Sequence, residues 1–146
     1  LIQSQEVPIS LSESWEFFSK PENLNEITPP DLEFRITSGK PDPMHDGQIV
    51  TYKIRVAPLI WNTWVTEIKG VIHEKQFIDE QRSGPYKFWH HLHEFEKTEN
   101  GTLIKDKVNY SLPFGLFGNI AHSIYVKKKL AEIFSYRKKI LTEKFG

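Results

Sequence analysis

The sequence predicts an α+β domain in which an antiparallel sheet is followed by one long C-terminal helix. Between residues 32 and 110, apolar and polar residues alternate in runs of strand length, and the runs are separated by turn residues. After residue 118 the apolar spacing changes to three and four residues, which is typical of a helix. Helices do not alternate with the strands, so a parallel α/β arrangement is disfavoured. At 146 residues, the chain fits a single domain spanning residues 1–146.

The N-terminal part predicts one strand and two short helices. The strand is expected over Ile2–Ile9. Ser10 followed by Glu13 has the spacing of a capping box and predicts a short helix that continues through Phe18. A second short helix is expected over Pro21–Glu26, since a proline suits the first helical turn and the two prolines that follow Thr28 must end it.

Six consecutive antiparallel strands are expected next. Gly70 breaks the pattern between the third and the fourth, and turns rich in Gly, Pro, Asn or Asp separate most of the others. The turn at Ala57–Ile60 is unusually apolar. The expected strands are Leu32–Ile36, Gln48–Val56, Asn62–Lys69, Val71–Gln81, Lys87–Lys97 and Thr102–Tyr110.

The C-terminal part predicts a hinge and a helix. Pro113–Gly118 combines a proline and two glycines with apolar residues, and we interpret it as a flexible apolar hinge. The helix expected over Asn119–Lys144 would span ~39 Å at 1.5 Å per residue, enough to cross a whole sheet. The lysines at 127 to 129 are interpreted as a solvated face. The expected apolar stripe consists of Ile120, Ile124, Leu130, Ile133, Phe134, Arg137, Ile140 and Leu141.

Polar and aromatic residues gather on one face of the last three strands. Side chains alternate across a strand, so Trp89, His91, His93 and Phe95 share one face. If the matching faces of the neighbouring strands coincide with it, two carboxylates, two imidazoles and an amide stand among aromatic rings. That mixture is not typical of a plain core. The neighbouring residues are Phe77, Asp79 and Gln81 on one side and Ile104, Asp106, Val108 and Tyr110 on the other.

Three interpretations of this cluster stay open, with His91, His93, Asp79 and Asp106 as the candidate catalytic residues. The imidazoles and a carboxylate could bind zinc or a similar divalent metal. They could also act as general acid and base near neutral pH. Alternatively, these side chains and Gln81 could satisfy one another's hydrogen bonds as a polar ladder. Because Cys is absent and hydrogen-bond partners abound, we expect no bound metal and no cofactor.

Composition and motifs exclude several classes of function. The chain has no Cys, which excludes disulfides, thiol nucleophiles and cysteine-ligated zinc. It has 19 basic and 19 acidic residues, and we expect no nucleic-acid partner. No Ser-His-Asp spacing, phosphate-binding glycine loop or dinucleotide fingerprint is present. No apolar run is long enough to span a membrane and no signal-peptide pattern opens the chain, so we expect a cytoplasmic protein without integral membrane association.

Several short motifs give the chain a family resemblance. They are Pro21-Glu22-Asn23-Leu24 with Ile27-Thr28-Pro29, Trp64 with Thr66 and Ile68, Phe77-Ile78-Asp79-Glu80-Gln81 with Gly84-Pro85-Tyr86, Trp89 with His91, His93 and Phe95, and Asp106 with Val108, Tyr110 and Pro113. With the order of the elements, they resemble the START and birch-pollen-allergen superfamily, also called SRPBCC or the polyketide cyclase/dehydrase-like group. The likeness covers essentially the whole chain and is closer to a bacterial subgroup described as ligand-binding SRPBCC proteins.

The resemblance implies a helix-grip fold, in which a curved seven-stranded antiparallel sheet and two short helices accompany a long C-terminal helix over an apolar cavity. The superfamily includes lipid carriers, hormone receptors, coenzyme Q-binding proteins and cyclases, so a shared fold does not define a shared function.

Two functions therefore stay open, and both use the expected cavity. The first is a binding or carrier protein for an apolar or amphipathic small molecule. The second is a cyclase or dehydratase-like enzyme in which His91 or His93 moves a proton on a polyketide-like or isoprenoid-like substrate. A third possibility is a vestigial cavity in a protein that binds a partner. The candidate ligand-binding residues are Tyr52, Trp64, Phe77, Asp79, Trp89, His91, His93, Phe95, Asp106, Tyr110, Phe117, Ile124 and Phe134.

Two apolar segments are expected to control access to this cavity. They are the Pro113–Gly118 hinge and the turn at Pro58–Ile60. Large apolar side chains in loops favour aggregation unless they cover something, so we expect them to cover the cavity mouth.

Overall fold

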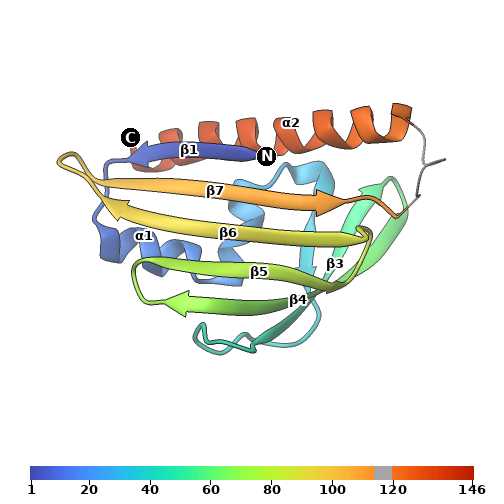
Figure 1. Ribbon diagram of the computed structural model, residues 1–146, viewed down its shortest axis with the longest axis horizontal. Coiled ribbons are helices and arrows are strands. Elements are labelled where there is room, and N and C mark those ends of the chain that lie inside the picture. Colours follow the sequence, from blue (N-terminus) through green and yellow to red (C-terminus); the bar gives the residue numbers. More distant parts are fainter. Residues whose placement is uncertain (114–119) are drawn as a thin grey trace.

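Seven strands form one antiparallel sheet in the computed structural model, which describes residues 1–113 and 120–146. The strands lie in the order β1-β7-β6-β5-β4-β3-β2 (Figure 1). From β2 to β7, each strand pairs with the next strand along the chain, and β1 is an edge strand beside β7. This confirms the expected α+β architecture. The strands are β1 (Ile2–Val7), β2 (Phe34–Ile36), β3 (Ile49–Ala57), β4 (Ile60–Ile72), β5 (Gln76–Ser83), β6 (Phe88–Lys97) and β7 (Thr102–Ser111).

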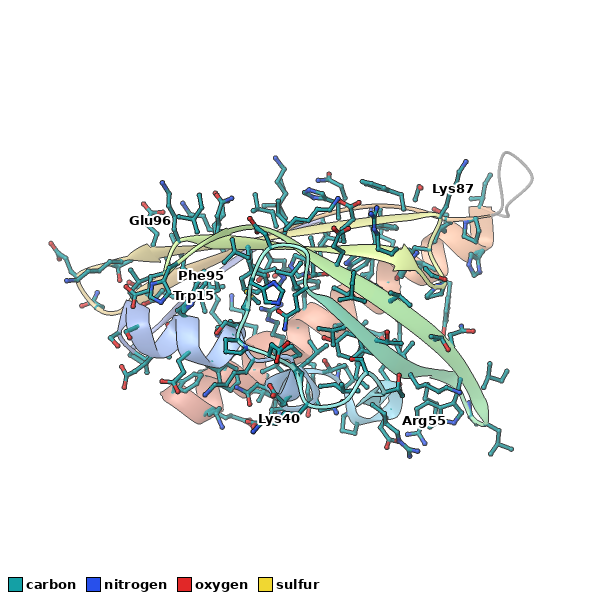
Figure 2. All side chains as sticks on the ribbon, turned by 90° about the horizontal axis from the view of Figure 1, so that it is seen from below. Trp15, Lys40, Arg55, Lys87, Phe95 and Glu96 are labelled. Atoms are coloured by element: carbon teal, nitrogen blue, oxygen red, sulfur yellow. The ribbon has the colours of Figure 1, made fainter. Side chains whose placement is uncertain are left out.

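The helical elements lie on one side of the curved sheet (Figure 2). They are α1 (Leu11–Phe18), the 3-10 helices η1 (Pro21–Ile27) and η2 (Pro30–Leu32), and α2 (Ile120–Phe145). The long helix α2 runs beside the edge strand β1 (Figure 1), and it also contacts η1. Gln5 of β1 fixes this packing, because its side-chain amide donates to the Lys138 carbonyl at 3.0 Å and to the Thr142 hydroxyl at 3.2 Å.

Local sequence signals explain how the short helices begin and end. The capping box is formed as expected: the Ser10 hydroxyl accepts from the Glu13 amide, and the Glu13 carboxylate accepts from the Ser10 amide. The predicted second helix forms as the 3-10 helix η1 and ends before the two prolines. Asn25 of η1 then pairs with the backbone of Phe34, which ties this helix to the short edge strand β2.

The observed strand ends differ from the predicted ones at several positions, and the differences at Gly70 and Leu32 have clear local causes. Gly70 does not end a strand: β4 continues to Ile72, and Gly70 takes a φ of 56° within a register irregularity. Glycine adopts this left-handed conformation at little cost, so the ladder bulges without ending. The chain reverses at residues 73–75 instead, where Glu74 also has a positive φ. Leu32 lies in η2 and not in a strand, because the prolines before it start a 3-10 turn.

The apolar core consists of two clusters between the sheet and the helices. The Trp64 cluster contains Val50, Tyr52, Ile54, Trp64, Trp89, Val108, Leu130 and Phe134. The Trp15 cluster contains Val7, Trp15, Ile27, Phe77, Phe95, Ile104 and Leu141. Both clusters bridge the sheet and α2, which is the packing expected of a helix-grip fold. The candidate polar residues lie between them: His91 packs against Trp89 and Phe134, and His93 stacks on Phe77.

Candidate ligand cavity and its buried histidine cluster

Strand register brings the predicted polar residues onto one face of the sheet. His93 of β6 lies opposite Phe77 of β5 and Asp106 of β7, and His91 lies opposite Asp79. Each strand has its alternate positions facing the helices, so the three faces coincide as the sequence predicts. His91, His93 and Asp106 are all buried, whereas the Asp79 side chain is 23% exposed.

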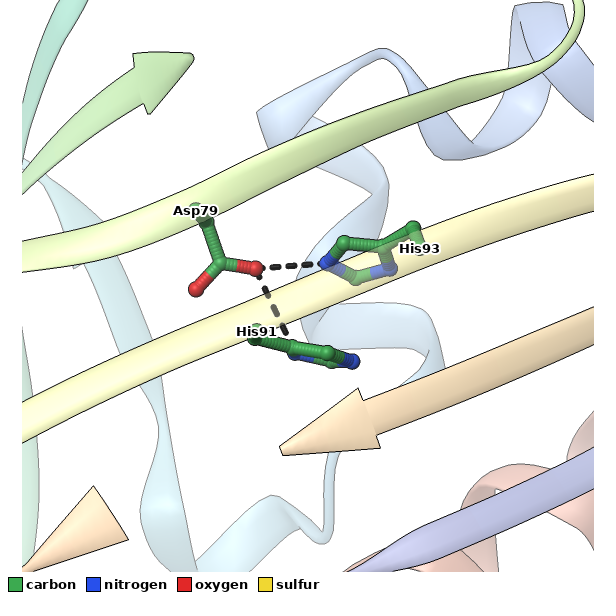
Figure 3. A group of neighbouring side chains, drawn as sticks. All are labelled: Asp79, His91 and His93. Carbon is green, nitrogen blue, oxygen red and sulfur yellow. Dashed lines mark hydrogen bonds and ion pairs between the residues drawn. The ribbon is translucent and has the colours of Figure 1, made fainter. Parts of the chain in front are cut away.

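Asp79 holds both imidazoles from the β5 side (Figure 3). Its Oδ2 atom accepts from His93 Nε2 at 2.5 Å and lies 3.3 Å from His91 Nδ1. Its Oδ1 atom accepts from the indole Nε1 of Trp89 at 2.9 Å. The two imidazole rings stack, with their centres 3.7 Å apart. Asp79 therefore fixes the orientation of three neighbouring side chains.

Asp106 completes the cluster from β7 and links it to α2. His91 Nε2 lies 2.8 Å from Asp106 Oδ1, and Arg137 of α2 places a guanidinium nitrogen 3.3 Å from the same oxygen. The guanidinium also packs over the rings of Phe18 and Phe134. Arg137 was predicted on the apolar stripe of the helix, and its burial there is explained by this carboxylate partner.

The close contacts between these groups shift the pKa values of His91, Asp79 and Asp106. Burial disfavours the His91 imidazolium, but the charge of Asp79 and hydrogen bonds with both aspartates outweigh burial and raise the pKa of His91 to about 9. Burial also opposes ionisation of the aspartates. The His91 and His93 imidazoles nevertheless hold the pKa of Asp79 well below its ordinary value, and Arg137 and both imidazoles do the same for Asp106. At neutral pH the two carboxylates therefore face the His91 imidazolium, and Asp106 also faces the Arg137 guanidinium.

A cavity of about 570 Å³ opens between this cluster, the sheet and the helices. Eight of the predicted ligand-binding residues line it: Tyr52, Trp64, Phe77, Asp79, Trp89, His91, His93 and Phe134. Most of the lining is apolar or aromatic, and it includes Phe17, Phe18, Leu24, Ile27, Phe34, Ile54, Tyr86, Val126, Leu130 and Ile133.

Four other predicted residues lie outside the described lining. Phe95 packs against Trp15 in the second core cluster. Asp106 lies behind the imidazoles and binds Arg137, and Tyr110 packs against Tyr86 at a ring distance of 5.8 Å. Ile124 is 63% exposed, because α2 presents Tyr125 and Val126 to the cavity instead. Phe117, with the rest of the predicted hinge from residue 114 onward, lies outside the described residues.

The expectation that the β3–β4 turn covers the cavity mouth is wrong. Leu59 is 95% exposed and Ile60 is 55% exposed, and neither lines the cavity. Leu59 occupies the tip of the hairpin with a φ of 63°, so its side chain projects into solvent. The prediction that Gln81 could join the polar ladder is also wrong. Its side chain forms hydrogen bonds with the backbone of Tyr86 and closes the β5–β6 turn.

Sequence reasoning missed several lining residues that come from outside the sheet pattern. They include Leu24 and Ile27 of η1 and Tyr86 in the β5–β6 turn. All three residues belong to the short motifs that give the chain its family resemblance. Membership of these motifs is the one sequence signal that could have identified them. Thr66 of β4 also belongs to these motifs and lines the cavity, but it was not predicted as a site residue.

Three of the clustered side chains have an arrangement that could bind a metal ion. Asp79, His91 and His93 each offer one ligand atom, and these atoms lie within 4.8 Å of one another. Two nitrogens and one carboxylate oxygen suit zinc and similar divalent ions. His91 Nε2 and His93 Nε2, however, lie within hydrogen-bonding distance of the two aspartates, so a metal bound at either atom would have to displace the proton that joins it to a carboxylate. The Nδ1 atom of His93 is buried and lies 3.3 Å from Asp106 Oδ1, but it forms no hydrogen bond with any described residue.

The comparisons with known proteins support the fold. No family model matches the chain, and no curated protein matches it. Among solved structures, the protein TTHA0849 from Thermus thermophilus aligns with a TM-score of 0.72 and 16% identity, over 98% of this chain and 94% of that one. A START superfamily protein from Mycobacterium smegmatis aligns with a TM-score of 0.72 and 14% identity, over 99% and 95% of the two chains.

A third similar structure is a nucleoside-diphosphate sugar epimerase from Corynebacterium glutamicum. It aligns with a TM-score of 0.73 and 22% identity over 98% of this chain, which spans only 28% of the epimerase. At these identities the likeness shows the fold alone. The fold is the helix-grip fold of START superfamily proteins, as the sequence motifs imply.

Within residues 1–113 and 120–146, no helix combines the length and the apolar character needed to cross a membrane.

Proposed function

We propose that this is a cytoplasmic binding or carrier protein that holds an apolar or amphipathic small molecule between the sheet and α2. The observation that carries the proposal is the cavity of about 570 Å³ with its largely apolar lining. Small-molecule sites commonly occupy ~300 to 1,000 Å³ and combine apolar walls with a few placed polar groups. Asp79, His91 and His93 supply such a polar group on the β5–β6 wall.

The free energy of a ligand in this cavity would come mainly from its apolar surface. Each Å² of apolar surface removed from water contributes about 25 cal/mol. Water is a poor competitor beside the apolar walls, because a buried water needs two to four polar partners. Rings at the centre of the lining are already ordered by one another, since Trp64 packs edge-on against Trp89 at 5.3 Å and Tyr86 packs against both. A ligand would therefore meet a largely formed surface.

Tryptophan fluorescence tests the proposal with a matched pair of variants. Trp64 lines the cavity, whereas Trp61 of the same strand stacks under Arg35 on the other face of the sheet. A nonfluorescent apolar quinone probe should quench the tryptophan emission, and the probe-dependent change in emission should be the same in the wild type and in Trp61→Phe. In Trp64→Phe the probe-dependent change should fall by about half, because Trp89 is then the one cavity tryptophan that remains.

Native mass spectrometry of the freshly purified protein provides a second test. A small molecule that travels with the protein and dissociates on unfolding would identify the ligand. The proposal is contradicted if no molecule copurifies and if a panel of fatty acids, sterols, flavonoids and quinones leaves the tryptophan emission unchanged.

A second candidate function is a cyclase or dehydratase-like enzyme, and one observation favours it. Both imidazoles line the cavity, with Asp106 behind them, which is the arrangement needed for proton transfer to a bound substrate. Because the pKa of His91 is raised to about 9, His91 would begin as a general acid. Incubation of polyketide-like and isoprenoid-like substrates with wild type and His91→Gln would distinguish the two functions, since a carrier leaves each substrate chemically unchanged.

A further inference from the structure

The basic side chains that line the cavity already have acidic partners. Among the described residues of the lining, the lysines and arginines are Lys20, Lys129 and Arg137. Lys20 pairs with Glu16 at 2.8 Å and Lys129 with Asp31 at 2.9 Å, while Arg137 pairs with Asp106. A ligand carboxylate could gain a cation only by taking it from one of these acids.

The acidic group of the lining is occupied as well. Asp79 is the one aspartate or glutamate among the described lining residues, and it accepts hydrogen bonds from Trp89 and His93 while it faces the His91 imidazolium. A ligand ammonium group would have to compete with these donors. Among the described residues, the lysine, arginine and aspartate side chains of the cavity wall therefore all have partners within the protein.

Three hydroxyl-bearing residues of the lining have the opposite property. Tyr52, Thr66 and Tyr86 line the cavity, and the hydroxyls of these residues form no hydrogen bond with any described residue. Tyr52 and Thr66 are buried residues of β3 and β4. These hydroxyls can therefore donate to or accept from a ligand oxygen without giving up a bond within the protein, and each such hydrogen bond contributes about 0.5 to 1.5 kcal/mol.

We infer that the ligand of this cavity is an electrically neutral molecule that carries hydroxyl or carbonyl oxygens on an apolar body. The inference rests on the proposed ligand-binding function and narrows it. Burying an unpaired carboxylate or ammonium costs several kcal/mol, whereas a neutral oxygen loses little when Tyr52, Thr66 or Tyr86 replaces its water. The local field acts in the same direction, since burial and the negative charges of Asp79 and Glu22 raise the pKa of Tyr52 and would repel an anion there.

Three probes with one common ring system test the charge preference. 1-Naphthalenemethanol is neutral, 1-naphthoate is an anion and 1-naphthylmethylammonium is a cation at about pH 7.5. Titration calorimetry with the whole protein should give a dissociation constant for the alcohol that is lower by about tenfold or more than that of either ion. If the naphthoate or the ammonium compound binds as tightly as the alcohol, the inference is overturned while ligand binding stands. If none of the three binds, the proposed function itself is overturned.

A hydroxyl deletion tests the role of the neutral polar groups. Tyr52→Phe should weaken binding of 1-naphthalenemethanol about threefold to tenfold and leave binding of 1-methylnaphthalene, which has no oxygen, unchanged. Tyr136→Phe is the matched control, because Tyr136 lies on α2 outside the described lining. Equal effects of Tyr52→Phe on the alcohol and the hydrocarbon would show that the ring and not the hydroxyl contacts the ligand, and would contradict the inference.

Discussion

His91 lies at the centre of a buried network in which each ring nitrogen faces a carboxylate. Its Nε2 atom lies 2.8 Å from Asp106 and its Nδ1 atom lies 3.3 Å from Asp79. An imidazolium can donate from both nitrogens, whereas a neutral imidazole can donate from only one. The charged form of His91 therefore fits this environment better, and the stability of the protein depends on that proton.

This dependence predicts how stability changes with pH. The pKa of His91 rises from 6.5 to about 9 on folding, so its contribution is complete below about pH 6.5 and is lost as the pH rises toward 9. The free energy of unfolding from urea titrations should fall by roughly 3 kcal/mol over that window. In His91→Gln the protein should be less stable at pH 6, but the decline between pH 6.5 and about 9 should disappear.

The aspartates predict a second decline at low pH. Their pKa values lie below the ordinary 3.8, so the stability that they contribute is present above about pH 4 and is lost as the pH falls further.

His90→Gln is the control for the His91 experiment, since His90 lies on the same strand with the opposite orientation. A wild-type protein that is equally stable at pH 6 and pH 9 would contradict the assignment of the charged state to His91.

Metal binding at the same residues can be tested directly. We predict that the cluster is held by hydrogen bonds and contains no metal ion, because all four ring nitrogens already lie within 3.3 Å of a carboxylate oxygen. Elemental analysis after purification without chelators should give far less than one metal per chain, and added Zn²⁺ should leave the melting temperature unchanged. Near-stoichiometric zinc, copper or iron would contradict the prediction and would place the metal among Asp79, His91 and His93.

At the scale of elements, α2 has two parts with different surroundings. Leu130, Phe134 and Leu141 are buried against the sheet, so the stripe predicted from the sequence is confirmed in this part of the helix. Ile120 and Ile124, at the N-terminal end of the same predicted stripe, are exposed. The helix therefore stabilises the fold mainly through its residues from Leu130 onward.

A pair of alanine substitutions tests this division. Leu141 is 2% exposed, and Leu141→Ala should lower the free energy of unfolding by about 2 to 5 kcal/mol, since it leaves a cavity in the core. Ile124→Ala should change it by less than about 0.5 kcal/mol, because the side chain is largely in solvent. Urea titrations of both variants give the two values. Similar losses in both would show that the whole helix packs equally.

Truncation before Leu130 extends the same test to the fold. The shortened chain would lack the buried contacts of Leu130, Phe134 and Leu141 with both core clusters. The loss of these contacts is comparable with the whole stability of a domain, about 5 to 15 kcal/mol. The truncated protein should show no cooperative unfolding by circular dichroism or calorimetry. A sharp melting transition would contradict the role assigned to α2.

At the scale of the whole molecule, the cavity and the polar cluster occupy the space between sheet and helices. The Asp79, His91 and His93 side chains lie where the two apolar clusters meet, and they line the cavity. A ligand that binds there would contact β3 to β6, η1 and α2 together. Binding should therefore stabilise the folded molecule as a unit.

This coupling gives a prediction for thermal unfolding. A probe such as 1-naphthalenemethanol at 100 times its dissociation constant should stabilise the folded state by about 2.7 kcal/mol. For a chain of this size the melting temperature should rise by roughly 5 to 15 °C. Trp64→Phe should reduce the rise and Trp61→Phe should not, since one side chain lines the cavity and the other lies on the outer face. A probe that binds by calorimetry without raising the melting temperature would have to bind the unfolded chain equally well, and would contradict a site that only the folded molecule provides.

Much of the fold could be predicted from the sequence, because the spacing of apolar residues indicates each strand and helix locally. Alternation with a period of two placed Trp89, His91, His93 and Phe95 on one face, and all four are buried there. The capping signal at Ser10 and Glu13 correctly marked the start of α1. The position of the β4–β5 reversal could not be predicted in the same way, because Gly70 is compatible with both a turn and a bulge and the pairing of the neighbouring strands decides between them.

The sequence by itself determined which side chains face the helices, since each strand has only two faces and burial selects the apolar one. Only the tertiary structure decided which of these residues border open space. Phe95 and Tyr110 share the face of His91, but neither belongs to the described lining of the cavity. Phe95 packs against Trp15, and Tyr110 packs against Tyr86. The partner of Arg137 was equally undecided until α2 was packed against the sheet. The physical reason is that alternation along a strand fixes only the direction of a side chain. The distance between opposing side chains depends on the curvature of the sheet and on the positions of η1 and α2. That distance determines where a cavity remains.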